Sequence, residues 1–130
     1  MKLRDLIPED FGGFIKREVR PCTLGDFCSA KPGEHTEHEY YVPTASIDEA
    51  DGVWFYCPKC YTANGGMRGT HSVICWRPRV PADVDPKPGR WEFQGTGLDD
   101  LTLVADSSSI LLRSGCCAHF FVQAGEIVMA

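Results

Sequence analysis

Residues 53–60 read Val-Trp-Phe-Tyr-Cys-Pro-Lys-Cys, a run of β-branched and aromatic residues that ends in two cysteines. Such runs are typical of β-strands. Two thiolates separated by two residues bind one metal ion when the chain turns sharply between them. Residues 64–66, Asn-Gly-Gly, are suited to a tight turn after the second cysteine. The stretch therefore predicts a strand that ends in half of a tetrahedral metal site.

Short runs of similar composition recur on both sides of this stretch, separated by Gly, Pro, Asn and Asp. They occupy residues 39–42, 72–76, 90–93, 101–104, 109–112 and 120–122. The pattern predicts a mainly β domain built from an antiparallel sheet. One or two short helices are expected beside the sheet, at residues 8–16 behind Pro8 and at residues 44–50 behind a polar cap.

A second pair of candidate metal ligands lies near the end of the chain. Cys116 and His119 repeat the two-residue spacing of Cys57 and Cys60, and a glycine precedes them. Together these four residues predict a Cys3His site for a structural Zn²⁺ ion, which has no open position for water. Cys117 adjoins Cys116, and the spacing favours Cys116 as the ligand.

Two other interpretations of the Cys-Pro-Lys-Cys stretch compete with the zinc site. A redox dithiol belongs at the start of a helix in a βαβ unit, and residues 61–66 do not read as a helix. Alternatively, free cysteines are often small buried hydrophobic residues. Two pairs of candidate ligands in one short chain favour the zinc site over both.

The cysteine content indicates a reducing compartment. The chain has seven cysteines, an odd number, and its first residues do not lead into the apolar stretch of a secretory signal. No apolar run approaches the roughly 20 residues that span a bilayer. We therefore expect reduced thiols, a cytoplasmic location and no membrane partner.

The length and composition predict one domain in two parts. The chain has 130 residues, of which 43% are hydrophobic, and this fits one compact unit spanning residues 1–130. Residues 1–52 are expected to form a less regular N-terminal part with an acidic insertion at 22–38. Residues 53–130 are expected to form the zinc-bound β core.

Other histidines and cysteines carry weaker signals. His71 lies at the start of a strand-like run, where it is either a base, a proton donor or spare ligand, or an ordinary core or edge histidine. Cys117 is a weak candidate nucleophile beside a histidine. Cys75 is expected in the core. His35 and His38 form a pair near Cys22 and Cys28 that reads more readily as acidic surface than as a second metal site.

The charge distribution gives mixed evidence about partners. The net charge of −5 counts against binding nucleic acid through the overall field. Residues 57–94 nevertheless hold six basic and three acidic residues, and arginine beside aromatic rings is used to stack on bases or to bind proteins. The candidate partner-binding residues are Arg68, Arg77, Arg79, Lys87, Arg90 and Trp91.

Several stretches together resemble a small family of uncharacterised proteins encoded by tailed phages and prophages. The stretches are residues 54–60, 69–76, 88–91, 97–103 and 115–121. More distantly they resemble a bacterial family of unknown function with a Cys-Pro-x-Cys turn and a closing Gly-Cys-x-x-His-Phe motif. The resemblance implies a phage or prophage origin and a bound zinc, gives the ligand role to Cys116 and implies no established activity.

These observations predict a zinc-binding module whose partner is a host or phage protein, acting in the host cytoplasm. One alternative is a nucleic-acid-binding protein similar to a zinc ribbon, which would use the basic residues. The other is a hydrolase or nuclease that uses His71, with Cys117 or a second metal.

Overall fold

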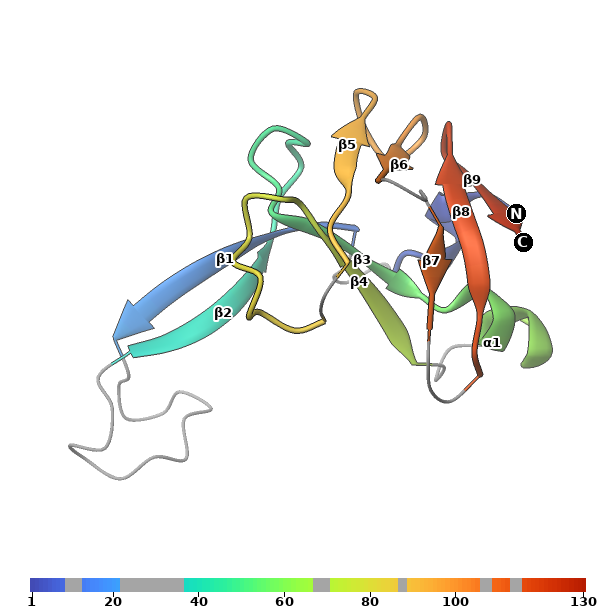
Figure 1. Ribbon diagram of the computed structural model, residues 1–130, viewed down its shortest axis with the longest axis horizontal. Helices are drawn as coiled ribbons and strands as arrows, with labels where there is room; N and C mark the ends of the chain where they lie inside the picture. The colour runs from blue at the N-terminus through green and yellow to red at the C-terminus, as the bar shows by residue number, and fades with distance from the viewer. Residues whose placement is uncertain (9–12, 22–36, 67–70, 87–88, 106–108, 113–115) are drawn as a thin grey trace.

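The computed structural model describes residues 1–8, 13–21, 37–66, 71–86, 89–105, 109–112 and 116–130. Strands dominate these residues, and the helical elements are one short α-helix and one 3-10 turn (Figure 1). The elements are η1 (Leu3–Leu6), β1 (Gly13–Pro21), β2 (Glu37–Pro43), β3 (Gly52–Tyr56), α1 (Pro58–Ala63), β4 (Ser72–Trp76), β5 (Glu92–Gln94), β6 (Thr102–Val104), β7 (Ile110–Leu111), β8 (His119–Gln123) and β9 (Glu126–Met129). The prediction of a mainly β, antiparallel domain is confirmed.

The largest sheet has four strands in the order β2-β1-β3-β4. Strand β3, the stretch that predicted the fold, pairs with β1 on one side and with β4 on the other. The hairpin of β1 and β2 extends away from the rest of the molecule (Figure 1). The pairing of Tyr56 with Ser72 sets the register of β3 and β4 at the end nearest α1.

Alternation along β3 and β4 divides their side chains between two hydrophobic clusters. Val53 and Phe55 enter the main core with Val73 and Cys75 of β4. Trp76 lies in the second cluster, on the other face of the sheet, and Trp54 and Ile74 pack against that cluster. Cys75 is fully buried, as expected.

The second sheet consists of β7, β8 and β9 and closes the main core. Phe120 of β8 meets Phe55 of β3 edge to face, with ring centroids 6.1 Å apart. Ala124 and Gly125 both have positive φ, which is the backbone that a tight two-residue hairpin between β8 and β9 requires. A side chain at Gly125 would collide with the Asp99 carbonyl at 2.0 Å, so glycine is needed there for space as well.

Residues 77–86 and 89–91, the described part of the loop between β4 and β5, cover the second cluster. The indole N–H of Trp76 donates to the Asp85 carbonyl at 2.8 Å, and the Trp91 N–H donates to the Trp76 carbonyl at 2.9 Å. Residues 95–100 form the turn between β5 and β6, because Asp100 accepts the N–H groups of Thr96 and Gly97.

Three local predictions differ from the structure. The expected helix at 8–16 is wrong from Gly13 onward, because β1 begins there and pairs with β2 and β3, whereas residues 9–12 lie outside the described residues. The expected helix at 44–50 is a single turn closed by the Ala50 N–H on the Ser46 carbonyl. Residues 61–66 were expected not to be helical, but α1 spans Pro58–Ala63 and so includes residues 61–63.

Candidate metal centre

Four side chains converge at one edge of the main core. The sulfurs of Cys57, Cys60 and Cys116 and a ring nitrogen of His71 all lie within 4.8 Å of one another. Cys57 is buried, Cys60 and Cys116 are half-buried and His71 is exposed, so the cluster joins the core to the surface. Three thiols and one imidazole can hold a metal ion, and this donor set fits zinc.

The unit of β3, α1 and β4 supplies three of the four ligands. Cys57 is the N-cap of α1 and directly follows β3, while Cys60 lies in the first turn of the helix. Pro58 at the first helical position favours this start, since its fixed φ suits a helix and its missing N–H has no partner there. The Cys57 N–H donates to the His71 carbonyl at 3.0 Å, which continues the pairing of β3 with β4. His71 is thereby held opposite Cys57.

The turn before β8 supplies the fourth ligand. Cys116 is half-buried within the group, whereas the next residue, Cys117, is exposed and has a φ of +53°. A left-handed residue turns the chain sharply, so adjacent cysteines take different directions and Cys116 faces the other ligands. The Lys59 ammonium donates to the Cys116 carbonyl at 2.7 Å and holds this turn against α1.

Two separations inside the group are slightly shorter than those of a tetrahedral site. Sulfurs around a zinc ion with Zn–S bonds of about 2.3 Å lie about 3.8 Å apart, and a histidine nitrogen lies about 3.6 Å from each sulfur. The Cys57 and Cys116 sulfurs are 3.4 Å apart, and the His71 Nε2 lies 3.2 Å from the Cys116 sulfur. An ion therefore needs an expansion of a few tenths of an ångström.

Burial raises the pKa values of the Cys57 and Cys116 thiols, whereas backbone N–H groups near their sulfurs lower these pKa values. Burial raises the pKa of Cys57 to about 11, although the N–H groups of Lys59 and Cys60 at its sulfur lower it in part. Burial also raises the pKa of Cys116, but hydrogen bonds from His71 and the Ala118 N–H and with the neighbouring thiols outweigh burial and bring it to about 6. N–H groups directed at sulfur stabilise thiolate, the form that binds metal.

The structure places His71, and not His119, in the ligand group. His119 is exposed at the start of β8, where it pairs with Leu111, and its ring centroid lies 6.2 Å from that of Phe121. Ala118 and Phe120 on either side of it are buried, so strand alternation directs His119 outward. The Cys-x-x-His spacing was therefore misleading, because it assumed that both ligand pairs were local.

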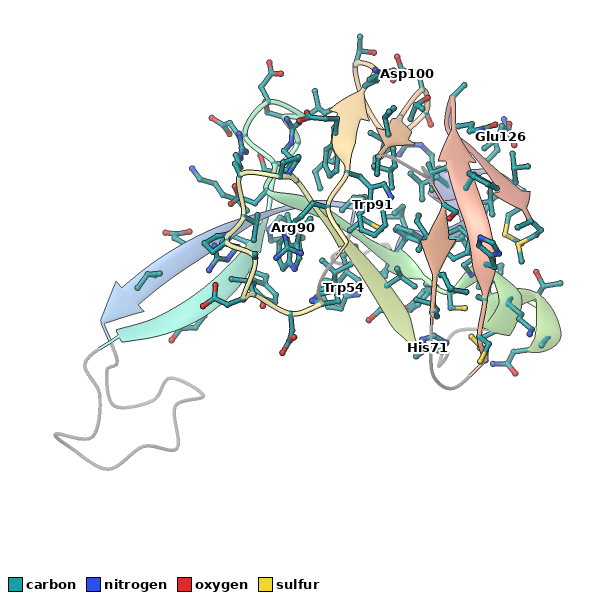
Figure 2. All side chains as sticks on the ribbon, in the orientation of Figure 1. Trp54, His71, Arg90, Trp91, Asp100 and Glu126 are labelled. Atoms are coloured by element: carbon teal, nitrogen blue, oxygen red, sulfur yellow. The ribbon has the colours of Figure 1, made fainter. Side chains whose placement is uncertain are left out.

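A different signal in the sequence points to His71. Pairing the run at 53–56 with the run at 72–76 in antiparallel register sets residue 57 opposite residue 71. Figure 2 shows His71 at the end of β4 that is nearest to the chain leading into β8. The cross-strand neighbour of a cysteine ligand is thus the residue to test for a further ligand.

The remaining candidate residues fall into two groups. Cys117 lies beside the cluster without belonging to it, and its sulfur is exposed. The predicted pair of His35 and His38, with Cys22 and Cys28, falls outside the residues whose side chains the structure describes.

The described members of the predicted partner-binding set contact the protein's own backbone. Arg77 donates to the Ile47 carbonyl and lies over the Phe93 ring. Arg79 donates to the Ala50 carbonyl and pairs with Asp51 at 3.0 Å. Arg90 donates to the backbone carbonyls of Val80, Pro81, Val84, Pro86 and Gly89 (Figure 2). Trp91 is half-buried against the main core, and Arg68 and Lys87 lie outside the described residues.

The presence of α1 removes one argument against the interpretation of Cys57 and Cys60 as a redox dithiol. A Cys-x-x-Cys pair at the start of a helix is the arrangement of redox dithiols, so the absence of a helix no longer argues against one. Two other observations favour a metal: a third cysteine and a histidine share the cluster, and the preceding strand is antiparallel to both neighbours.

No helix among the described residues has the length and apolar character needed to cross a membrane. Comparisons of the chain with protein-family models, curated proteins and solved structures gave no match. The resemblance to a phage and prophage family therefore stays a prediction.

Proposed function

We propose that the chain is a small zinc-stabilised β domain in which one Zn²⁺ ion, held by Cys57, Cys60, His71 and Cys116, has a structural role. The observation that carries this proposal is the convergence of four donor atoms within 4.8 Å. Zinc, when bound, supplies four strong bonds in place of packing, and a site with four protein ligands has no open position for substrate water.

The position of the ligands supports a structural role. Three ligands belong to β3, α1 and β4, and the fourth belongs to the turn that leads into the second sheet. Closing the site links the end of β3 and the start of α1 to the turn before β8, and so joins the two sheets. A small domain gains most from a link between segments that are distant in sequence.

We propose further that the domain works as a protein-interaction module in the cytoplasm of a phage-infected or lysogenic host cell, where thiols remain reduced. The net charge of −5 and the use of Arg77, Arg79 and Arg90 on the protein's own carbonyls favour a protein partner over nucleic acid. A hydrolase that uses His71 as a base is less favoured, because a nitrogen that binds metal cannot accept a proton.

Metal analysis of the purified chain tests the structural site. We expect one zinc per chain, and we expect Cys57→Ser to lose the metal and to unfold at 25 °C, since it removes a buried ligand. The matched control is Cys117→Ser, which changes an exposed thiol outside the group. A Cys57→Ser protein with unchanged zinc content and unfolding midpoint would refute the proposal.

Nucleic-acid binding is tested separately with single-stranded and double-stranded DNA at increasing salt. A phosphate-binding protein loses affinity steeply as salt rises. We expect no salt-sensitive binding. Micromolar binding that weakens strongly between 50 and 200 mM salt would overturn the preference for a protein partner.

A further inference from the structure

Two thiols of the metal centre are in direct contact, although they come from distant parts of the chain. The Cys57 and Cys116 sulfurs are 3.4 Å apart, and the Cys60 sulfur lies within 4.8 Å of both. Cys57 follows β3 of the four-stranded sheet, Cys116 precedes β8 of the three-stranded sheet, and 59 positions separate the two cysteines in the sequence. A covalent bond between them would join the same two parts of the fold as the metal does.

We propose that Cys57 and Cys116 are the site of an oxidative modification: a peroxide converts them to a disulfide and releases the metal. The inference rests on the proposed function, since it names a way in which the same site is regulated. A disulfide needs the two sulfurs to approach to about 2.05 Å. His71 and Cys60 lose their bond to the metal in the same event.

The difference in exposure between the two cysteines determines which sulfur the peroxide oxidises first. Cys57 is fully buried, whereas Cys116 is half-buried and lies beside the exposed His71. Hydrogen peroxide therefore reaches the Cys116 sulfur first. The buried Cys57 sulfur, already in contact with it, is the thiolate positioned to complete the reaction.

The chemistry balances as a two-electron oxidation. The Cys116 thiolate attacks one peroxide oxygen, the O–O bond breaks, and a sulfenic acid and hydroxide form. The Cys57 thiolate then attacks the Cys116 sulfur, the S–O bond breaks, and a disulfide and a second hydroxide form. Both sulfurs are oxidised, the peroxide is reduced, and the zinc leaves as Zn²⁺ with its charge unchanged.

The proposed disulfide has a structural consequence that other oxidations lack. It closes a loop of 59 positions and so restricts the unfolded chain. We therefore expect the oxidised, metal-free protein to keep more structure than the reduced, metal-free protein. A Cys57–Cys60 disulfide would lie within α1 and its cap, and would leave the two sheets unlinked.

The experiment uses the full chain with the changes Cys22→Ser, Cys28→Ser and Cys117→Ser, which leave Cys57, Cys60, Cys75 and Cys116. The zinc-loaded protein is treated with hydrogen peroxide, and released zinc, free thiols and disulfide-linked peptides are measured. We expect one zinc released per chain, two thiols lost, a peptide joining Cys57 to Cys116, and reversal by dithiothreitol with added zinc.

Each outcome distinguishes this inference from the proposed function. A chain that neither carries zinc nor binds added zinc overturns both. A chain that binds zinc but yields a Cys57–Cys60 disulfide, or sulfinic acids with no linked peptide, leaves the structural zinc site standing and overturns the inference. A circular dichroism spectrum of the oxidised protein that matches unfolded chain would also overturn it.

Discussion

His71 reaches the metal centre through strand pairing. Its carbonyl accepts the Cys57 N–H at 3.0 Å, and its Nε2 lies 3.2 Å from the Cys116 sulfur. His71 thus contacts both Cys57 and Cys116, two ligands that lie far apart in the sequence. His119, in contrast, is exposed on the outer side of β8.

Replacing each histidine in turn distinguishes a ligand set that contains His71 from one that contains His119. We expect His71→Ala to weaken zinc binding by at least about 100-fold, because even loss of a group that supports a ligand costs about 10–100-fold. His119→Ala should leave the affinity within about twofold. Competition titrations against a chelator of known affinity measure both, and the reverse ranking would restore His119 as the ligand.

Much of the site was predictable at the level of single residues. Cys57 and Cys60 follow from local spacing, because a turn places residues two apart around one ion. Cys116 was predicted from its spacing to His119, so the cysteine lies in the group although the argument for it does not hold. The histidine ligand does not follow from local spacing, because its position depends on the register between β3 and β4, and the local spacing offered His119 instead. Long-range pairing was therefore the missing information.

At the scale of elements, the described part of the loop between β4 and β5, residues 77–86 and 89–91, folds around the guanidinium of Arg90. Arg90 makes five hydrogen bonds to backbone carbonyls of this loop. A loop rich in proline has few N–H groups with which to satisfy its own carbonyls. The side chain of Arg90 supplies those donors, and the loop in turn covers Trp76.

Removing that guanidinium should loosen the loop. We expect Arg90→Met to lower the free energy of unfolding by about 2–4 kcal/mol, since hydrogen bonds from a charged donor contribute about 1.5–3 kcal/mol and several are lost together. The control is Arg4→Met, which removes an exposed ion pair with Asp99 and should cost less than about 1 kcal/mol. Urea unfolding of both variants gives the comparison, and equal costs would contradict the role of Arg90.

The turn between β5 and β6 gives a pH-dependent contribution to stability. The N–H groups of Thr96 and Gly97 donate to Asp100 and lower the pKa of its carboxyl below its usual range. A carboxyl whose pKa is lower in the folded than in the unfolded protein stabilises the fold at pH values above its unfolded pKa. This contribution is lost as the pH falls through the pKa of the folded protein. The turn is therefore strongest at neutral pH.

The change Asp100→Asn removes the charge while keeping the shape. We expect this variant to melt at a lower temperature than the unchanged protein at pH 7, and the gap to narrow between pH 5 and pH 3. Loss of metal in acid would unfold both proteins and close the gap by itself, so the gap is compared only at pH values where metal analysis finds zinc still bound to both. Melting curves at several pH values measure the gap, and a gap that widens toward acid would contradict this account.

The elements themselves were predictable to different degrees. The runs at 53–56 and 72–76 became β3 and β4 because their β-branched and aromatic residues fit a pleated sheet buried on both faces. Strand β1 was missed because its charged residues gave no apolar alternation, and its pairing with β2 forms it. Helix α1 was missed because it is only six residues long and depends on Pro58 and the Cys57 cap.

At the scale of the whole molecule, the metal centre and the main core connect the same two sheets. Phe55 and Phe120 meet within the core, and Cys57 and Cys116 meet at its edge. Structural zinc contributes about 10–16 kcal/mol in small metal-dependent folds, whereas a whole domain has a net stability of about 5–15 kcal/mol. The metal can therefore decide whether this chain is folded.

Removing the metal under reducing conditions should unfold the protein. We expect the dispersed amide signals of the NMR spectrum to collapse after chelation and to return when one equivalent of Zn²⁺ is added. Mg²⁺ serves as the control ion, because it prefers oxygen ligands and should not restore the spectrum. A dispersed spectrum that survives complete chelation would show that packing alone maintains the fold.

The separation of Cys57 from Cys116 by 59 positions also affects how a proteolytic cut in the backbone would be detected. Coordination closes a ring that contains the whole segment of chain between the two ligands. A protease that cuts once inside that ring produces two fragments that still share an ion and a core. The nicked protein would elute from a sizing column as one particle, and the break would become visible only once a chelator and a denaturant released the fragments.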